Sequence, residues 1–189
     1  MLRGEKVDLR SRSDADVAVL HAELYDDVPT RSRADSRPWV PLSADSPASP
    51  FRAAEPAADV AVFSVVECAG GELAGEALLW GIDLHNRAAH LGVSLRPGFR
   101  GRGLSVDVLR VLCRYGFGTR GLHRLQLETL ADNQPMIKAA TRVGFTHEGT
   151  LRGGAWVDGA FADEVVLGLL APEWTSAEAR AVGRGRYSV

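Results

Sequence analysis

Glycines and arginines alternate in the segment Leu95–Ser105, where an apolar, strand-like run ends and an amphipathic helical pattern begins at about Leu104. Glycine permits a positive φ and leaves the backbone N–H uncovered by a side chain. A helix N-terminus adds further unpaired N–H groups and the positive end of a dipole. The combination predicts a cradle for a phosphate or pyrophosphate group. The glycines are Gly98, Gly101 and Gly103, and the arginines are Arg96, Arg100 and Arg102.

The spacing of these glycines excludes two common nucleotide-binding motifs. The dinucleotide fingerprint G-x-G-x-x-G requires a third glycine where this chain has Val106. The mononucleotide P-loop ends in Gly-Lys-Ser or Gly-Lys-Thr, and neither tripeptide occurs in the sequence. Taken alone, the glycine-rich loop is as consistent with a structural turn as with a ligand site.

A second segment, which begins at Asp132, supplies the context for this loop. Together the two segments resemble the acetyl-CoA-binding motifs of the GNAT N-acetyltransferases. They are most similar to the branch that acetylates the N-terminal alanine and serine residues of ribosomal proteins. The similarity covers most of the chain apart from residues 27–58. The matching motifs are Arg100–Gly103, Asn133, Val143–Phe145, Glu148–Arg152, Gly4–Arg10, Gly121–Arg124 and Glu173–Trp174.

The resemblance implies that acetyl-CoA is the co-substrate and that the loop amides from Phe99 to Ser105 bind its pyrophosphate. It also implies that Asn133 contacts the pantetheine arm, although an asparagine after a strand is also an ordinary helix cap. The side chains of the loop arginines either pair with phosphates or remain solvated. The residues expected to bind acetyl-CoA are Leu95, Arg100, Gly101, Arg102, Gly103, Leu104, Ser105 and Asn133.

Acyl transfer to an ammonium group requires a base, and Glu128 is the first candidate. It stands five positions before the family's asparagine, a spacing that matches the general-base glutamate in one group of bacterial N-terminal acetyltransferases. The alternative for Glu128 is an ion pair with Arg124 or Arg142. His90 is the second candidate, because imidazole titrates near neutral pH and relatives often carry glutamate at this position.

The general acid of the family has no counterpart at its usual positions. Relatives often place a serine or a tyrosine where this chain has Met136 and Ala140, whose side chains cannot protonate a thiolate. Solvent, the product ammonium or a residue outside these motifs must supply the proton, or the protein binds acyl-CoA with little catalysis. Glu76 is a third candidate for the base.

The hydrophobic pattern and the resemblance predict a mixed α/β fold with a mostly antiparallel sheet of six or seven strands. Residues 89–130 are expected to form a right-handed parallel β-α-β crossover, and the resemblance implies that its strands splay apart to admit acyl-CoA. Strands are expected over residues 5–10, 60–68, 72–83, 88–95, 125–130, 149–156 and 163–170. Helices are expected over Asp14–Tyr25 with Ser13 as cap, from Leu104 onward, and over Gln134–Arg142 with Gly144 as C-cap.

One acetyltransferase domain is expected over residues 1–174, followed by a flexible tail at 175–189. Residues 27–58 form a proline- and serine-rich insertion with little periodicity. In the family this region covers the acceptor site, so we interpret it as a substrate lid with Trp39 and Phe51 as substrate-binding anchors. A mobile insertion is the alternative.

Composition and charge favour a single-domain enzyme of the cytoplasm. The 189 residues, 46% of them hydrophobic, suffice for one core, and the net charge of −2 indicates neither nucleic acid nor an anionic membrane as partner. No apolar run is long enough to span a bilayer, and the first residues do not resemble a signal peptide. Neither the two cysteines nor His85, His123 and His147 show metal-ligand spacing, so no metal is expected.

The function that these observations favour is an acetyl-CoA-dependent N-acetyltransferase. A primary amine, either a protein N-terminus or a small molecule, would attack the thioester directly in a ternary complex. Two alternatives stay open: an acyl-CoA-binding sensor or interaction module with little catalysis, and an enzyme that uses another donor such as succinyl-CoA. The latter needs an additional cation beside the acyl pocket. A homodimer formed through strand edges is expected only by analogy with similar folds.

Overall fold

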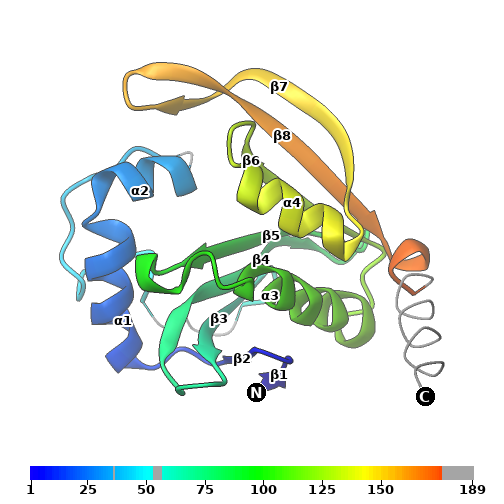
Figure 1. The fold of residues 1–189 in the computed structure, drawn as a ribbon, viewed down its shortest axis with the longest axis horizontal. Helices are drawn as coiled ribbons and strands as arrows, with labels where there is room; N and C mark the ends of the chain where they lie inside the picture. Colours follow the sequence, from blue (N-terminus) through cyan, green and yellow to red (C-terminus); the bar gives the residue numbers. More distant parts are fainter. Residues whose placement is uncertain (36, 53–56, 176–189) are drawn as a thin grey trace.

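The computed structural model describes residues 1–35, 37–52 and 57–175 of the chain. The strands are Leu2–Arg3 (β1), Val7–Arg10 (β2), Val60–Glu67 (β3), Leu73–Asp83 (β4), Ala88–Leu95 (β5), Arg124–Leu130 (β6), Thr146–Val157 (β7) and Ala160–Leu170 (β8). The helices are Asp14–Leu20 (α1), Val28–Ala34 (α2), Leu104–Cys113 (α3) and Gln134–Val143 (α4), with π-helical turns at His21–Tyr25 and Arg114–Thr119 and a 3-10 turn at Pro97–Phe99. The described strands form one sheet in the order β1-β2-β3-β4-β5-β6-β8-β7 (Figure 1).

The sheet confirms the predicted mixed α/β architecture and has one strand more than expected. Every pairing is antiparallel except that of β5 with β6. The additional strand is β1, in which Leu2 and Arg3 pair with Leu9 and Asp8 of β2. Two residues are too few to show an alternating pattern, so the expectation of six or seven strands was wrong by this element.

The strands β5 and β6 form the parallel pair of the crossover and separate soon after they meet. Their ladder joins only Ala88–His90 to Arg124–Gln126. Beyond these residues β5 stays paired with β4 as far as Leu95, while β6 stays paired with β8 as far as Leu130. Because each strand keeps its other neighbour, the sheet opens between β5 and β6.

The main hydrophobic core lies between the sheet and the helices α3 and α4, which follow β5 and β6 in the chain. The buried side chains of α3 have the predicted helical spacing, and Cys113 is buried among them. The helix α4 ends at Gly144, whose φ of 114° is the left-handed conformation of a C-cap, and Phe145 is buried directly after it. Core packing therefore fixes one helix behind each of the two separating strands.

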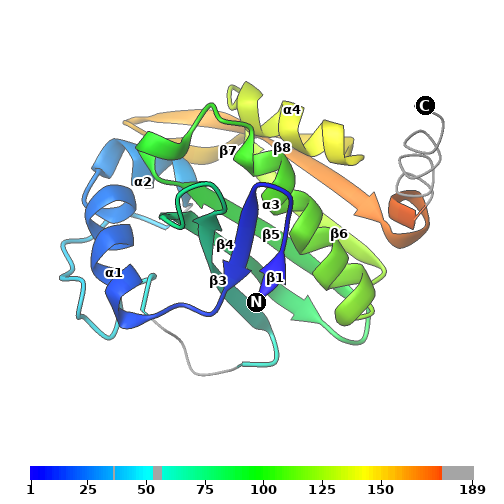
Figure 2. The same cartoon turned by 60° about the horizontal axis from the view of Figure 1, so that its bottom comes forward.

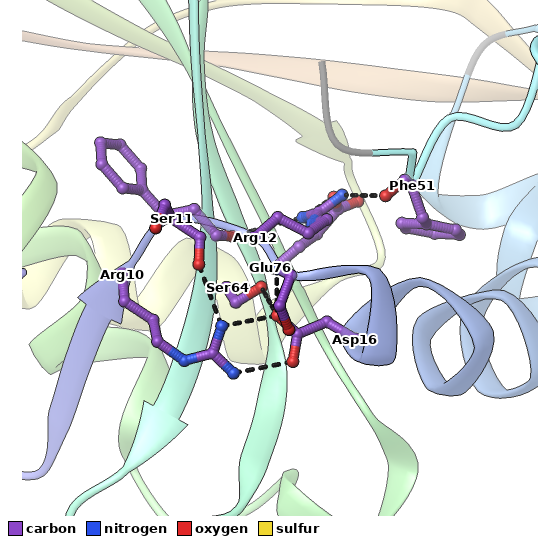
Figure 3. A network of polar contacts seen from close by, with 9 residues as sticks. Arg10, Ser11, Arg12, Asp16, Phe51, Ser64 and Glu76 are labelled. Atoms are coloured by element: carbon purple, nitrogen blue, oxygen red, sulfur yellow. Dashed lines mark hydrogen bonds and ion pairs between the residues drawn. The ribbon is translucent and has the colours of Figure 1, made fainter. Parts of the chain in front are cut away.

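A network of charged groups fixes α1 on the sheet (Figure 3). Asp16 in the first turn of α1 accepts hydrogen bonds from Arg10 at 2.6 and 2.7 Å and from Ser64 of β3 at 2.9 Å. Burial raises the pKa of Asp16, but the hydrogen bonds from Arg10, Ser13 and Ser64 outweigh it and hold the pKa well below its ordinary value. Asp16 therefore joins α1, β2 and β3 as an ionised carboxylate.

The helix α2 occupies part of the proline-rich segment that was expected to be irregular. Asp27 caps this helix, because its carboxylate accepts hydrogen bonds from the N–H of Thr30 at 3.3 Å and from its hydroxyl at 2.6 Å. Pro29 stands in the first turn, where a missing N–H removes no intrahelical hydrogen bond. This helix was not expected, because the segment shows little apolar periodicity.

Of the tail expected at 175–189, only Thr175 belongs to the described residues. Among the helices that the structure describes, none is both long and apolar enough to span a membrane. Within the same part of the chain, no three His, Cys, Asp or Glu side chains are grouped so that they could hold a metal ion.

Candidate functional site

The glycine-rich loop joins the end of β5 to the start of α3. Gly101 and Gly103 have φ values of 74° and 77°, in the left-handed region that favours glycine, and Gly103 is the N-cap of α3. A Cβ added at Gly101 would meet no atom within 4 Å, so the surface over the loop is open. Leu104 and Ser105 begin the helix, and the N–H groups of its first turn have no partner within the helix. The loop therefore offers backbone donors and a positive helix end to an anion.

The two loop arginines expected near the phosphates are held by the protein itself. Arg100 donates a hydrogen bond from Nε to the carbonyl oxygen of Leu95 at 2.9 Å. Arg102 forms an ion pair with Glu67 of β3 at 3.1 Å, and its guanidinium carbon lies 4.8 Å from the centre of the Phe99 ring. Both arginines are exposed, but each already has a partner within the protein in this conformation.

Asn133 lies at the N-terminus of α4, after the other separating strand. Its Oδ1 accepts a hydrogen bond from the N–H of Met136 at 3.4 Å, and its Nδ2 donates to the hydroxyl of Thr129 at 2.9 Å. The side chain therefore acts as a helix cap, one of the two roles that the sequence indicated, and the two roles can coexist. The cap places the N-terminus of α4 directly after β6, as the glycine-rich loop places that of α3 after β5.

His90 and Glu128 meet where β5 and β6 separate. His90 is the last residue of β5 in the parallel ladder, and its Nδ1 lies 2.9 Å from Oε1 of Glu128. The side-chain amide of Gln126 donates a hydrogen bond to the same carboxylate oxygen. The side chains are 31% exposed for His90 and 20% for Glu128, so both are in contact with solvent. With Glu128 ionised, this geometry assigns the proton of a neutral imidazole to Nδ1 and leaves Nε2 as an acceptor.

Two residues of β4 position the imidazole of His90. Trp80 lies opposite His90 in the antiparallel register and stacks on it, with ring centres 4.2 Å apart and an angle of 22° between the planes. Gly81 follows with a φ of 57°, and a Cβ added there would lie 3.3 Å from Cδ2 and 3.9 Å from Nε2 of His90. Trp80 therefore fixes the plane of the ring, and the absence of a side chain at Gly81 leaves room beside it.

The charges near Glu128 are an arginine that already has a carboxylate partner and a second carboxylate. Arg124 pairs with Glu148, so the ion pair between Glu128 and Arg124 that the sequence left open does not form. Glu164 of β8 lies diagonally across from Glu128 on the same face of the sheet. Burial raises the pKa of Glu164, and the neighbouring charge of Glu128 raises it further. This part of the sheet therefore favours a cation in its surroundings.

Glu76, the third candidate for the base, belongs to a buried ion pair. Its carboxylate accepts a hydrogen bond from Arg12 at 2.8 Å, and the side chains are 11% and 2% exposed (Figure 3). Burial raises the pKa of Glu76 in spite of the attraction to Arg12. Arg12 also donates to the carbonyl oxygen of Phe51 at 3.1 Å. The pair therefore ties the segment around Phe51 to the sheet.

The segment that the sequence indicated as a substrate lid packs against α1. Phe51 is 1% exposed within a second hydrophobic cluster, whereas Trp39 is half-buried at its margin and donates from its indole nitrogen to the carbonyl oxygen of Tyr25 at 3.0 Å. Arg33 of α2 forms an ion pair at 2.6 Å with Asp132, the residue before the cap of α4. Phe51 thus anchors the segment in the second hydrophobic cluster. The helix α2 contacts the loop between β6 and α4 through Arg33.

Trp80, Gly81 and Gln126 were not singled out by the sequence, although they surround two residues that were. The signal for Trp80 was available, because a hairpin of the predicted strands 72–83 and 88–95 brings its aromatic ring near His90. The contribution of Gln126 depends on the rotamer of Glu128, which no pattern reveals.

The fold and the site combine a glycine-rich loop at the N-terminus of a helix with a histidine–glutamate contact where two parallel strands separate. The profile of the acetyltransferase (GNAT) domain family matches residues 6–146, and the chain belongs to this family. The resemblance inferred from the motifs is thereby confirmed.

Three comparisons show the range of the family that this chain resembles. It is 33% identical over 104 residues to the putative ribosomal N-acetyltransferase YdaF of Bacillus subtilis (strain 168), covering 55% of this chain and 57% of that protein. It is 31% identical over 88 residues to the ribosomal protein uS5-alanine N-acetyltransferase of Escherichia coli (strain K12), covering 47% and 45%. The chain thus spans about half the length of the curated relatives it matches. The spermidine N-acetyltransferase of Vibrio cholerae, solved in complex with CoA and spermine, superposes with a TM-score of 0.80 at 20% identity over 90% of this chain and 98% of that one, which shows the common fold.

Proposed function

We propose that this protein is an acyl-CoA-dependent N-acetyltransferase that acetylates a primary amine. The observation that carries the proposal is the meeting of His90 and Glu128 at the split between the strand that leads to the anion-binding loop and its parallel neighbour. The six residues of β5 from His90 to Leu95 span about 16 Å, because the five steps between them have the usual rise of a strand. This length is comparable to an extended pantetheine arm. A donor held by its pyrophosphate at the loop would therefore bring its thioester close to His90.

In the proposed reaction, acetyl-CoA supplies an electrophilic thioester carbonyl and His90 supplies the base. Nε2 of His90 takes a proton from the ammonium group of the acceptor, while Glu128 accepts the hydrogen bond from Nδ1–H and stabilises the imidazolium. The neutral nitrogen forms a bond with the carbonyl carbon, and the bond between that carbon and sulfur breaks. Glu128 is thus the partner of the base, and His90 is the residue that touches the acceptor.

The departing thiolate also requires a proton, and the acceptor can deliver it. After attack, the nitrogen carries a proton that the product amide must lose, and transfer of this proton to sulfur, directly or through water, balances the step. The usual family positions cannot help, since Ala140 is buried in the core and Met136 has no acidic proton. Positioning of the two reactants then supplies much of the rate enhancement.

The surroundings of the base favour a cationic acceptor. Glu128 and Glu164 lie on one face of the sheet, and both attract an ammonium group before it loses its proton. The names of the relatives include spermidine and the alanine of ribosomal protein uS5, both of which offer primary amines. We therefore infer a protein N-terminus or a small cationic amine as the acceptor.

Release of free CoA thiol tests the proposal. Purified protein is incubated with acetyl-CoA and, separately, spermidine, a peptide with an N-terminal alanine, and free amino acids, and the products are weighed by mass spectrometry. Thiol release that depends on an amine, with a product heavier by one acetyl group, supports the enzyme. CoA binding without thiol release for every amine would instead identify an acyl-CoA sensor. Parallel reactions with succinyl-CoA distinguish the other donor.

A further inference from the structure

Lys6 lies beside the glycine-rich loop although it is far from the loop in sequence. A Cβ added at Gly103, the N-cap of α3, would lie 3.6 Å from Nζ of Lys6, the nearest atom outside the loop. Lys6 stands in the turn between β1 and β2, and Figure 2 shows this hairpin beside α3. The ammonium group is therefore at the positive end of α3, where the loop offers its N–H groups.

The backbone of this turn is held against α3 by a buried carboxylate. Asp107, in the first turn of α3 and 5% exposed, accepts hydrogen bonds through Oδ2 from the N–H of Lys6 at 2.7 Å and of Val7 at 3.0 Å. Gly4 closes the turn by donating to the carbonyl oxygen of Val7 at 2.8 Å. A Cβ added at Gly4 would lie 2.6 Å from that oxygen and 3.0 Å from Cγ of Asp107, so the turn requires glycine. The position of Lys6 is thus built into the fold.

The ammonium of Lys6 differs from the other cations near the loop in having no partner. Arg102 is neutralised by Glu67, and Arg100 is bound to the carbonyl oxygen of Leu95. Throughout the part of the chain that the structure describes, no hydrogen bond or ion pair engages the side chain of Lys6. A lysine ammonium is a mobile point charge that suits phosphate oxygens, and an unpaired cation next to unpaired N–H groups attracts an anion.

We propose that Lys6 binds a phosphate group of acyl-CoA and that Asp107 and Gly4 position the lysine for this role. The proposal rests on the proposed function, since it assigns a further binding residue to the same donor site. The phosphate is either part of the pyrophosphate at the loop or the 3′-phosphate of the ribose, and the chemistry of recognition is shared. Neither the motifs of the loop nor those around α4 include Lys6.

Calorimetric titration of two variants tests this assignment. Lys6→Gln removes the ammonium but keeps the backbone bonds to Asp107, and Arg110→Gln removes one charge from an exposed position further along the same helix. We expect Lys6→Gln to weaken CoA binding about tenfold and to reduce its dependence on salt, with Lys6→Arg recovering part of the affinity. Arg110→Gln should bind CoA like the wild type.

Titration with dephospho-CoA and with pantetheine locates the contact. If Lys6→Gln weakens both CoA and dephospho-CoA, the lysine binds the pyrophosphate. If dephospho-CoA binds equally to wild type and variant, the lysine binds the 3′-phosphate. Pantetheine, which lacks these phosphates, should not distinguish the two proteins. Equal CoA affinity of Lys6→Gln and wild type would overturn the assignment alone, whereas a wild type that binds no CoA would overturn the proposed function as well.

Discussion

Nδ1 of His90 lies 2.9 Å from Oε1 of Glu128 across a parallel ladder that ends at His90 itself. The two side chains therefore bridge β5 and β6 at the last point where the strands are joined, and the opening begins just beyond them. Trp80 covers one face of the imidazole ring by stacking on it. This arrangement presents Nδ1 to the carboxylate and leaves Nε2 for the proton transfer proposed above.

We expect His90 and Glu128 to act as one unit in acyl transfer. His90→Gln should lower the rate constant about 10²-fold and should abolish the fall in wild-type rate at low pH that reports protonation of a base. Glu128→Gln should also lower the rate, because it removes the charge that stabilises the imidazolium. The double variant should lose little more than either single variant, as measured by single-turnover kinetics at saturating acetyl-CoA.

The exposed His85 provides the matched control for this pair, since His85→Gln removes an imidazole in the turn after β4 without touching the opening. It should retain wild-type rate and pH dependence. Multiplicative losses in the double variant would show that the residues act independently. Full activity of His90→Gln, Glu128→Gln and the double variant would mean that the acceptor arrives deprotonated and that positioning alone drives the reaction.

Gly103→Val should weaken acyl-CoA binding at least tenfold. The substitution puts a branched side chain where the anion is proposed to bind. The φ of 77° at position 103 also strains any residue other than glycine by about 1–2 kcal/mol. Gly118→Val is the control, because Gly118 lies outside the loop, a Cβ there meets nothing within 4 Å and the position needs no positive φ. Calorimetry on both folded variants makes the comparison. Equal affinities would show that the loop is only a structural turn.

Local patterns were sufficient to predict seven of the strands and the helices α1, α3 and α4, because each buries a periodic face. They failed at β1, whose two residues carry no period, and at α2, whose first turn accepts Pro29. For the site, the crossover predicted that His90 and Glu128 would lie on neighbouring strands. Whether they touch depends on the register of a ladder only three residues long, which local patterns do not encode.

Among the proposed binding residues, too, the sequence predicted the backbone conformation but not the side-chain contacts. Glycine spacing predicted where the backbone turns, because a left-handed φ is energetically unfavourable for residues other than glycine. The partners of Arg100 and Arg102 depend instead on rotamers and on elements distant in sequence. The position of Lys6 could not be predicted for the same reason. Its ammonium group lies near the loop only because the turn between β1 and β2 packs next to α3.

Arg33→Gln should affect the acceptor rather than the donor. The ion pair of Arg33 with Asp132 is exposed, at 43% and 67% of the two side chains, so its loss should change stability by less than about 1 kcal/mol. Releasing α2 from the loop between β6 and α4 should raise KM for the acceptor severalfold if α2 shapes the acceptor site. CoA affinity should stay unchanged.

Arg37→Gln tests whether this effect is specific. Arg37 belongs to the same segment but pairs with Asp35, and its side chain is 74% exposed. It should leave KM for the acceptor near the wild-type value. If Arg33→Gln instead reduces CoA affinity, α2 serves the donor site, and the interpretation of residues 27–58 as a substrate lid is wrong.

Asp16→Asn should destabilise the fold by about 1–3 kcal/mol at neutral pH, because it weakens the charged hydrogen bonds that join α1 to β2 and β3. The folded pKa of Asp16 lies below its ordinary value of about 4, so its contribution is complete above that value and is lost as the pH falls through the folded pKa. Urea unfolding should therefore show a constant difference between wild type and variant from pH 7 to about pH 5 and a shrinking one below about pH 4. The exposed Asp14 supplies the control, since Asp14→Asn changes the same helix turn without entering the network. A difference for Asp16→Asn that persists undiminished to pH 2 would show that its effect comes from packing rather than from the ionised carboxylate.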